Sequence, residues 1–294
     1  MMRFSLMCRL LLASLAVSFA SHAAASEPAL TLSVFNPGTQ AMFPVSSVLV
    51  FGGHDAILVD AQFGKTQALQ VVETIRNSGK TLTTIYISHG DPDYYFGLDT
   101  ITTAFPAAKV VASAQTVAHI KKTMVDKLAF WGPKMGADAP SRLVVPEVLA
   151  GNSLTLEGHA LNVMGLDGKQ PDRSFVWIPS IKAVVGGVVV SDNIHVWMAD
   201  TQTEQSHRYW VNTLNQIASL KPLTVIPGHY LGTTAYSIEA VNFTRDYIKA
   251  FDNAAINASD SVGMITSMTK RYPELGEVSS LELSAKVVKG ELQW

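Results

Sequence analysis

The sequence predicts a layered α/β fold, because strands and a helix alternate in its first hundred residues. An apolar strand at Ala56–Val59 ends at Asp60, a helix follows at Lys65–Asn77, and a second apolar strand at Thr83–Ser88 runs directly into His89. Helices that alternate with strands pack as layers over the faces of a sheet. The chain has 294 residues, of which 48% are hydrophobic and 16% charged, so it can bury a sizeable core. One large domain is the simplest expectation.

The N-terminal half begins with two expected strands. They lie at Leu30–Phe35 and Ser47–Phe51, and the turn-forming segment Asn36–Gly38 follows the first of them. The helix at Lys65–Asn77 carries its apolar residues at helical spacing, and Gly79 just beyond it is a typical stop signal.

The second half of the chain repeats this alternation. The expected strands are Val110–Ala112, Ser153–Leu156, Ala160–Met164, Ser174–Ile178, Ala183–Val190 and Thr224–Ile226. The expected helices are Gln115–Lys127 and Glu204–Leu220, and the tail Ser237–Lys289 is mostly helical. Between them, Ala129–Ser141 is expected to be a long loop because it contains Gly132, Pro133, Gly136 and Pro140, and such loops often cover binding sites.

The first 25 residues have the order of a secretory signal peptide. Arg3 and Arg9 precede or flank an uncharged apolar run, and small alanines follow it. We predict cleavage after Ala25, with Ala23 as the alternative, which leaves a single domain at 26–294. The apolar run is too short for a stable membrane anchor. The mature protein is therefore expected in the periplasm or outside the cell, without a membrane anchor.

Charge and cysteine content restrict the possible functions. Lys and Arg number 22 against 24 Asp and Glu, and they form no basic cluster of the kind that binds nucleic acid. The expected partner is a small-molecule substrate. Cys8 is the only cysteine and lies in the signal segment, so the mature protein can use neither a cysteine nucleophile nor a cysteine metal ligand.

Three possible metal ligands fall within five residues, where the strand Thr83–Ser88 ends. They are His89, Asp91 and Asp93, at alternate positions of a tight turn before a possible helix. Their side chains can converge there, and one imidazole with carboxylates suits a divalent ion of borderline to hard character.

Each of these residues also has a purely structural interpretation. Asp91 before Pro92 is equally typical of a helix N-terminus, with Asp as the cap and Pro in the first turn. His89 could be a buried histidine that bonds the backbone, and Asp93 could cap the helix or bond a loop. Tyr94 is interpreted first as packing and second as a weak ligand or a hydrogen-bond donor to substrate.

The segment resembles the His-x-His-x-Asp-His motif of the metallo-β-lactamase superfamily, in the expected strand-to-helix context. His89 and Asp93 match the first histidine and the aspartate, whereas Asp91 and Tyr94 replace the second and the last histidine. Asp60 resembles the strand-terminal aspartate that supports the site in this family. His229, in Pro-Gly-His, resembles its distal histidine.

This resemblance extends from about Leu30 to about His229 and implies an αββα sandwich with a helical C-terminal part at about 237–294. It also implies metal-dependent hydrolysis. The family's third histidine is missing, and Asp167, the aligned residue, is more simply a turn residue. The glycine-aspartate pair that bridges two metals in the family is Gly186–Gly187 here.

The remaining ligand set therefore favours one divalent ion, expected to be zinc, held by His89, Asp91, Asp93 and His229. Asp93 would orient a water or hold the ion, and His195 is a candidate for a supporting position behind the ligands or for substrate contact. The implied reaction is attack of an activated water on an ester, lactone, lactam or related bond.

The alternative is a non-catalytic periplasmic binding or accessory protein that kept the fold after its metal site decayed. These two functions predict different geometry. Asp91 and Tyr94 pointing into a common pocket with His229 would favour a catalytic site, whereas helix capping by Asp91 and packing by Tyr94 would favour the alternative.

Overall fold

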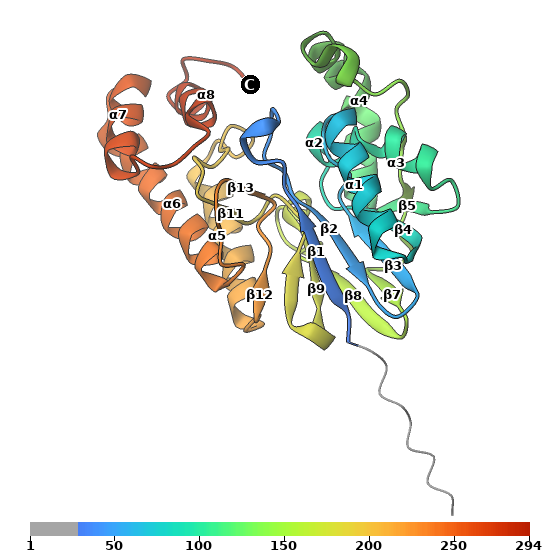
Figure 1. The fold of residues 1–294 in the computed structure, drawn as a ribbon. Helices are drawn as coiled ribbons and strands as arrows, with labels where there is room; N and C mark the ends of the chain where they lie inside the picture. Colours follow the sequence, from blue (N-terminus) through green and yellow to red (C-terminus); the bar gives the residue numbers. More distant parts are fainter. Residues whose placement is uncertain (1–28) are drawn as a thin grey trace, which may run out of the picture.

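The computed structural model describes residues 29–294, and within them two β-sheets pack face to face between two helical layers (Figure 1). The first sheet has the order β1-β2-β3-β4-β5-β6, and the second has the order β12-β10-β9-β8-β7. The predicted αββα sandwich is confirmed. The proposed signal peptide at residues 1–25 lies outside the described residues.

The strands are short, and their bounds are these. The first sheet contains β1 Thr31–Phe35, β2 Ser47–Phe51, β3 Asp55–Val59, β4 Thr81–Ile87, β5 Lys109–Ala112 and β6 Glu147–Val148. The second contains β7 Ser153–Leu156, β8 His159–Met164, β9 Phe175–Ile178, β10 Ala183–Val185 and β12 Thr224–Val225. A separate parallel pair is formed by β11 Ser191–Asp192 and β13 His229–Tyr230.

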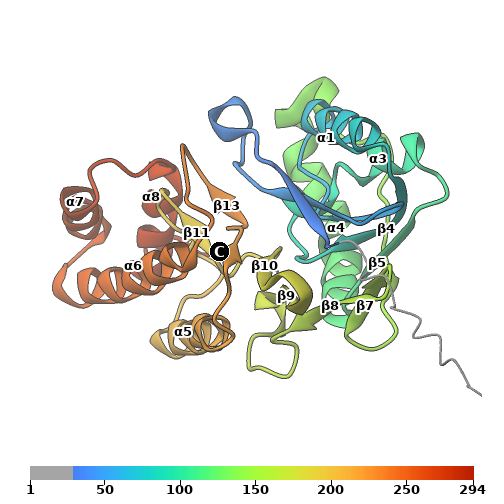
Figure 2. The same cartoon turned by 60° about the horizontal axis from the view of Figure 1, so that its bottom comes forward.

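The helices divide between the two outer faces. One side of the molecule carries α1 Lys65–Ser78, α2 Pro92–Tyr95, α3 Leu98–Ala104 and α4 Ala114–Met135. The other side carries α5 Glu204–Ser219, α6 Ile238–Asn257, α7 Ser261–Arg271 and α8 Val278–Val288, which are farthest from α1 in both views (Figures 1 and 2). The predicted helical tail is thus confirmed as α6 to α8. None of the helices in residues 29–294 is long and apolar enough to cross a bilayer.

Three apolar layers hold this arrangement together, and strand periodicity explains them. In β2, Val48 and Val50 face the second sheet, whereas Leu49 faces the helices. In β3, Ile57 faces the second sheet and Leu58 the helices. Successive side chains point to opposite faces of a strand, so a strand buried on both faces is apolar throughout. A third cluster lies between the second sheet and α5 to α8.

The prediction of a loop at Ala129–Ser141 is wrong for the first half of this segment, because α4 continues to Met135. Pro133 lacks the backbone N–H that would bond Ala129 O, and its ring crowds that carbonyl, so the helix continues at a local cost. Trp131 packs edge-to-face against Phe43 and Phe63, with ring centroids 5.3 and 5.6 Å apart. These aromatic contacts favour the continued helix over the local breaking tendency of Gly and Pro.

The expected strand at Ala183–Val190 is also too long, because β10 ends at Val185. Gly186 and Gly187 follow with φ of 70° and 85°, which takes the backbone out of the extended region. The chain then turns from the second sheet towards β11.

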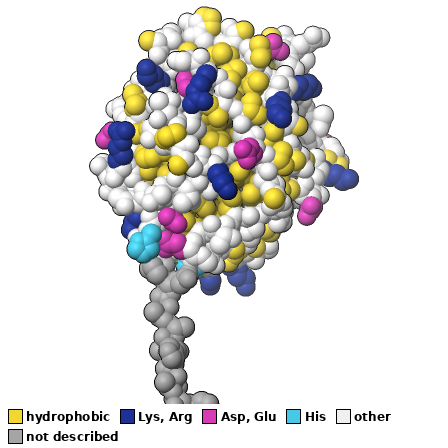
Figure 3. All heavy atoms as spheres, turned by 90° about the vertical axis from the view of Figure 1, so that its right-hand side faces the viewer, with side chains coloured by type: hydrophobic (Ala, Val, Ile, Leu, Met, Phe, Trp, Pro, Cys, Tyr) yellow, Lys and Arg dark blue, Asp and Glu magenta, His cyan; other side chains and the backbone are white. Residues whose placement is uncertain are grey.

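The helical face over α3 and α4 shows how charge is distributed on one side of the molecule. Lys and Arg side chains are scattered there among apolar and acidic ones (Figure 3).

Candidate functional site

The turn that follows β4 is held by Asp60, which ends the neighbouring parallel strand β3. The Asp60 carboxylate accepts hydrogen bonds from Ser88 N at 2.8 Å and from Ser88 Oγ at 2.6 Å. Asp60 is buried in the left-handed region with φ 67°. Burial raises the pKa of Asp60 to about 7, although the bonds from Ser88 oppose this effect. Asp60 thus fixes the start of the turn from a buried position.

Asp93 and His229 meet although they lie 136 positions apart in the sequence. His229 Nε2 is 2.7 Å from Asp93 Oδ2, and the two side chains are 16% and 10% exposed. Asp93 comes from the first turn of α2, and His229 begins β13. Gly228 allows this approach, because a Cβ there would lie 2.1 Å from Gly187 O.

Tyr94 connects the two ends of the site. Its hydroxyl is 3.2 Å from His229 Nδ1, and its ring packs against the rings of His89 and His229 at centroid distances of 5.1 and 5.5 Å. Burial raises the pKa of Tyr94 well above its ordinary value, and the carboxylate of Asp93 adds to this. The side chain therefore remains a neutral phenol that both packs and hydrogen-bonds.

Asp91 occupies the N-cap position of α2, but its side chain makes no capping hydrogen bond. One carboxylate oxygen lies 3.5 Å from His89 Nδ1, and the other lies 3.4 Å from Lys127 Nζ on α4. His89 Nδ1 also accepts a hydrogen bond from the Asp91 backbone N–H at 3.2 Å. Burial alone would raise the pKa of Asp91, yet His89, Lys127 and His119 together lower it.

Comparison with known proteins identifies the family. A model of the metallo-beta-lactamase superfamily matches residues 42–229, which contain the whole site described above. The chain belongs to the metallo-β-lactamase superfamily. Membership of this superfamily supports a hydrolase function.

Solved structures of the same superfamily share the fold at low sequence identity. A metallo-beta-lactamase family protein from Thermus thermophilus has a TM-score of 0.61 at 15% identity, over 88% of this chain and 94% of that one. DIM-1 metallo-beta-lactamase has a TM-score of 0.53 at 19% identity, over 76% of this chain and 99% of that one. A metallo-beta-lactamase from Pontibacter korlensis gives 0.53 at 18% identity, over 76% and 96%. At these identities the likeness shows the fold alone. Curated proteins give no match.

Two predicted site residues lie away from the Asp93–His229 pair. Asp167 is exposed in the turn Gly165–Gly168, which is closed by a backbone hydrogen bond of 3.1 Å. His195 is buried in the C-terminal layer, where its Nδ1 lies 3.0 Å from Tyr247 OH on α6. The structure does not bring either residue together with the others.

Several residues near the site were not singled out from the sequence. Lys127 and His119 reach Asp91 from α4. Glu277, at the start of α8, lies close enough to His229 for the imidazole to affect its pKa, which burial raises. Arg173 is fully buried, its guanidinium stacks 3.7 Å from the Trp210 ring, and its Nε and Nη1 atoms have no partner among residues 29–294. These four residues come near the site only because the helices and strands that carry them pack together. A local sequence pattern therefore gives no signal for them.

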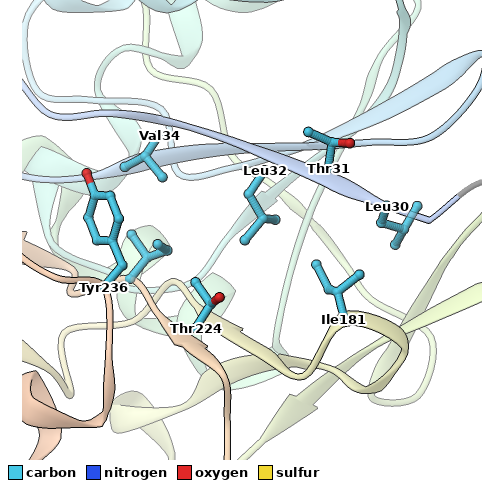
Figure 4. A pocket seen from close by; sticks show the side chains of 8 residues that line it. Leu30, Thr31, Leu32, Val34, Ile181, Thr224 and Tyr236 are labelled. Atoms are coloured by element: carbon cyan, nitrogen blue, oxygen red, sulfur yellow. The ribbon is translucent and has the colours of Figure 1, made fainter.

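An apolar cavity of about 540 Å³ lies elsewhere, along β1 (Figure 4). Leu30, Leu32, Ile181 and Ile226 are among the residues that line it, and no predicted site residue is one of them. The strand register places the start of β1 beside the end of β2 and the start of β3 and β4. His89 follows the other end of β4, so the cavity and His89 lie at opposite ends of the strands. This cavity is therefore distinct from the candidate site.

The donor set does not fit the two-ion centre of the superfamily. Within residues 29–294, no group of three or more His, Cys, Asp or Glu side chains is arranged to hold a metal ion. The His89–Asp91 pair already has the Lys127 ammonium beside it. The Asp93–His229 pair does have suitable donor chemistry, a carboxylate and an imidazole nitrogen at 2.7 Å. The pair offers two protein ligands, where catalytic zinc sites usually have three, so these residues fit at most one ion.

Proposed function

We propose that this protein is a hydrolase whose reaction centre is the Asp93–His229 pair, and that it uses one divalent ion, zinc being the expected one. The observation that carries the proposal is the 2.7 Å separation of Asp93 Oδ2 and His229 Nε2. Two atoms with lone pairs approach this closely only with a proton between them, as in a hydrogen bond. The pair therefore holds a proton as it stands, and its imidazole and carboxylate are also ligand types that would bind a divalent ion in place of that proton.

Tyr94 allows both states of this pair. When His229 Nε2 carries a proton and donates it to Asp93, Nδ1 accepts a hydrogen bond from the Tyr94 hydroxyl. When Nε2 faces an ion instead, Nδ1 carries the proton and the same hydroxyl accepts it. A metal-binding histidine usually donates its other N–H in this way.

Asp93 is the group that would handle the proton of the attacking water. One of its oxygens is bonded to His229, and the other makes no hydrogen bond within residues 29–294. That free oxygen would accept a proton from a water, as a general base does. A bound divalent ion supplies Lewis acidity, which makes a water more acidic and stabilises negative charge on a substrate oxygen.

The substrate class proposed is an ester, lactone, lactam or related bond. Superfamily membership supports hydrolysis but leaves the bond open, because one fold serves many reactions.

A metal assay combined with a substrate panel tests the proposal. We expect the purified protein to bind about one equivalent of zinc and to hydrolyse at least one ester, lactone, lactam or phosphodiester substrate. Asp93→Asn should reduce kcat by about 10²- to 10⁴-fold, since it removes the general base. The exposed His54→Gln variant is the matched control and should leave activity unchanged. Absence of turnover on the whole panel, or full activity of Asp93→Asn, would contradict the proposal.

A second candidate is the non-catalytic binding or accessory protein, and one observation favours it. Lys127 fills the His89–Asp91 pair, and no three metal-ligating side chains converge in residues 29–294. Binding of a panel compound without turnover, unaffected by zinc removal, would establish this function instead.

We further propose that the protein is exported and acts in the periplasm or outside the cell. The order of residues in the N-terminal segment supports this proposal. N-terminal sequencing of protein recovered from a periplasmic extract should begin at Ser26. An uncleaved start at Met1 in a cytoplasmic fraction would refute it.

A further inference from the structure

Asp91 lies among basic side chains that come from two different elements. Its Oδ2 is 3.5 Å from His89 Nδ1 in the same turn, and its Oδ1 is 3.4 Å from Lys127 Nζ. His119 is a third basic neighbour. The side chains of Asp91 and Lys127 are 24% and 29% exposed, so the ion pair lies at the mouth of the site and partly out of water.

The long helix α4 holds Lys127 in this position. The helix begins at Ser113, whose side chain accepts a hydrogen bond from Thr116 N at 3.1 Å. His119 fixes the helix against the turn, because a Cβ on Gly90 would lie only 2.6 Å from the His119 ring. Lys127 follows about two turns later, on the same side of the helix. The packing of α4 against the turn therefore holds the Lys127 ammonium close to Asp91.

A metal ion at the His89–Asp91 pair would have to share the carboxylate with this ammonium. Lys127 Nζ lies 3.4 Å from Asp91 Oδ1, and the other carboxylate oxygen, Oδ2, faces His89. A divalent cation brought to Oδ2 would be repelled by the ammonium charge on the other side of the same carboxylate. The family motif has a histidine at the position of Asp91. A carboxylate there carries a negative charge that balances the positive charge of Lys127, which a neutral histidine would not do.

We propose that the Lys127 ammonium takes the place of a metal ion at the His89–Asp91 pair, so that this half of the site carries a permanent organic cation. The inference rests on the proposed function, in which Asp93 and His229 form the other half. An ammonium has three N–H donors, and Asp91 uses one of them. The others can donate to a substrate oxygen, which keeps the electrostatic part of a metal ion's role.

Zinc titration of purified protein tests this inference without measuring activity. Lys127→Met keeps the aliphatic stem and removes the charge. We expect this variant to bind one more equivalent of zinc than the unsubstituted protein, with affinity at the new site raised at least about tenfold, in isothermal titration calorimetry and elemental analysis. Lys127→Arg keeps the charge and should bind zinc as the unsubstituted protein does.

Two further variants make the test specific. Lys122→Met removes an exposed charge from the same helix and should leave the zinc count unchanged. Adding Asp91→Asn to Lys127→Met should abolish the extra equivalent, because the carboxylate is then missing. An unchanged zinc count in Lys127→Met, with native secondary structure by circular dichroism, would overturn the inference, as would two equivalents in the unsubstituted protein. Failure of the proposed function appears separately, as absence of hydrolysis.

Discussion

Two histidines of this protein pair with aspartates, and their surroundings differ. His207 Nδ1 lies 2.5 Å from Asp252 Oδ1, and its Nε2 lies 2.5 Å from Thr201 O. His229 Nε2 lies 2.7 Å from Asp93 Oδ2, but its Nδ1 meets the Tyr94 hydroxyl. The side chain of His207 is 3% exposed, whereas that of His229 is 16% exposed.

The difference lies in the third partner of each pair. A backbone carbonyl can only accept a hydrogen bond, so Nε2 of His207 must be the donor to Thr201 O. A hydroxyl can donate or accept, so Nδ1 of His229 can take either role towards Tyr94. Histidine-aspartate pairing alone therefore does not indicate chemistry. Two further properties matter. One is whether the group on the second ring nitrogen of the histidine can both donate and accept a hydrogen bond, and the other is whether solvent reaches the imidazole.

The largest effect on stability should come from the His207–Asp252 pair, because the His207 imidazole is the more deeply buried of the two imidazoles. We expect His207→Ala to lower the free energy of unfolding by about 3 kcal/mol, because it leaves Asp252 and a buried carbonyl without a partner. His229→Ala should lower the free energy of unfolding by only about 1 kcal/mol, since the His229 imidazole is partly exposed. Urea denaturation of both variants measures the difference. Equal losses would remove the distinction drawn between the two pairs.

The contribution of the hydroxyl can be isolated with Tyr94→Phe. This variant keeps the ring that packs against His89 and His229 and removes only the group that orients His229. We expect zinc affinity to fall by about 10- to 100-fold, the usual range for loss of such a partner. Affinity is read by competition with a chelator. An unchanged affinity would mean that His229 needs no hydroxyl partner.

The sequence alone predicts where most of the site residues lie, because they follow the ends of apolar strands. Asp60, His89 and Asp93 follow apolar strands whose burial fixes where they end, and Pro-Gly before His229 marks another turn. Lys127 could not be placed in the same way, because its contact with Asp91 depends on how α4 is rotated against the turn. That rotation is set by packing such as His119 on Gly90, which joins segments distant in the sequence.

The limits of the elements were harder to predict than their existence. At Gly132 and Pro133 the local pattern indicated a loop, but aromatic contacts of Trp131 extend α4 through them. At Gly186 the apolar pattern indicated a continued strand, but the positive φ ends it. In both places tertiary contacts or backbone geometry override the local signal.

Asp60 should give the protein a pH dependence of stability. Its pKa is about 7 in the folded protein against 3.8 for an ordinary Asp, so the folded state holds an extra proton between these values. The free energy of unfolding should then fall as pH rises from about 4 to about 7, by at most about 1.4 kcal/mol per pH unit. Urea denaturation across this range should show a shallower decline in Asp60→Asn. An identical slope in the variant would contradict the assignment.

The smallest effect is expected at Glu157, far from both pairs. Its carboxylate accepts hydrogen bonds from the backbone N–H groups of Asp55, His54 and Gly53, which lower its pKa to about 2. The stabilisation is present above pH 4.5 and is lost as pH falls towards 2. Glu157→Gln should therefore be slightly less stable than the unsubstituted protein at pH 7, and the two should converge near pH 2. Thermal unfolding at both pH values checks this.

The backbone at Gly187 leaves no room for the bridging aspartate that the superfamily carries at the corresponding position. The residue stands where the resemblance places that aspartate, yet its φ is 85° and a Cβ there would lie 2.1 Å from Ser174 O. Because the obstacle is main chain, a neighbouring side chain cannot yield to make room. A single Gly187→Asp substitution would therefore not supply a bridging carboxylate unless the main chain around residues 174 and 187 also moved apart.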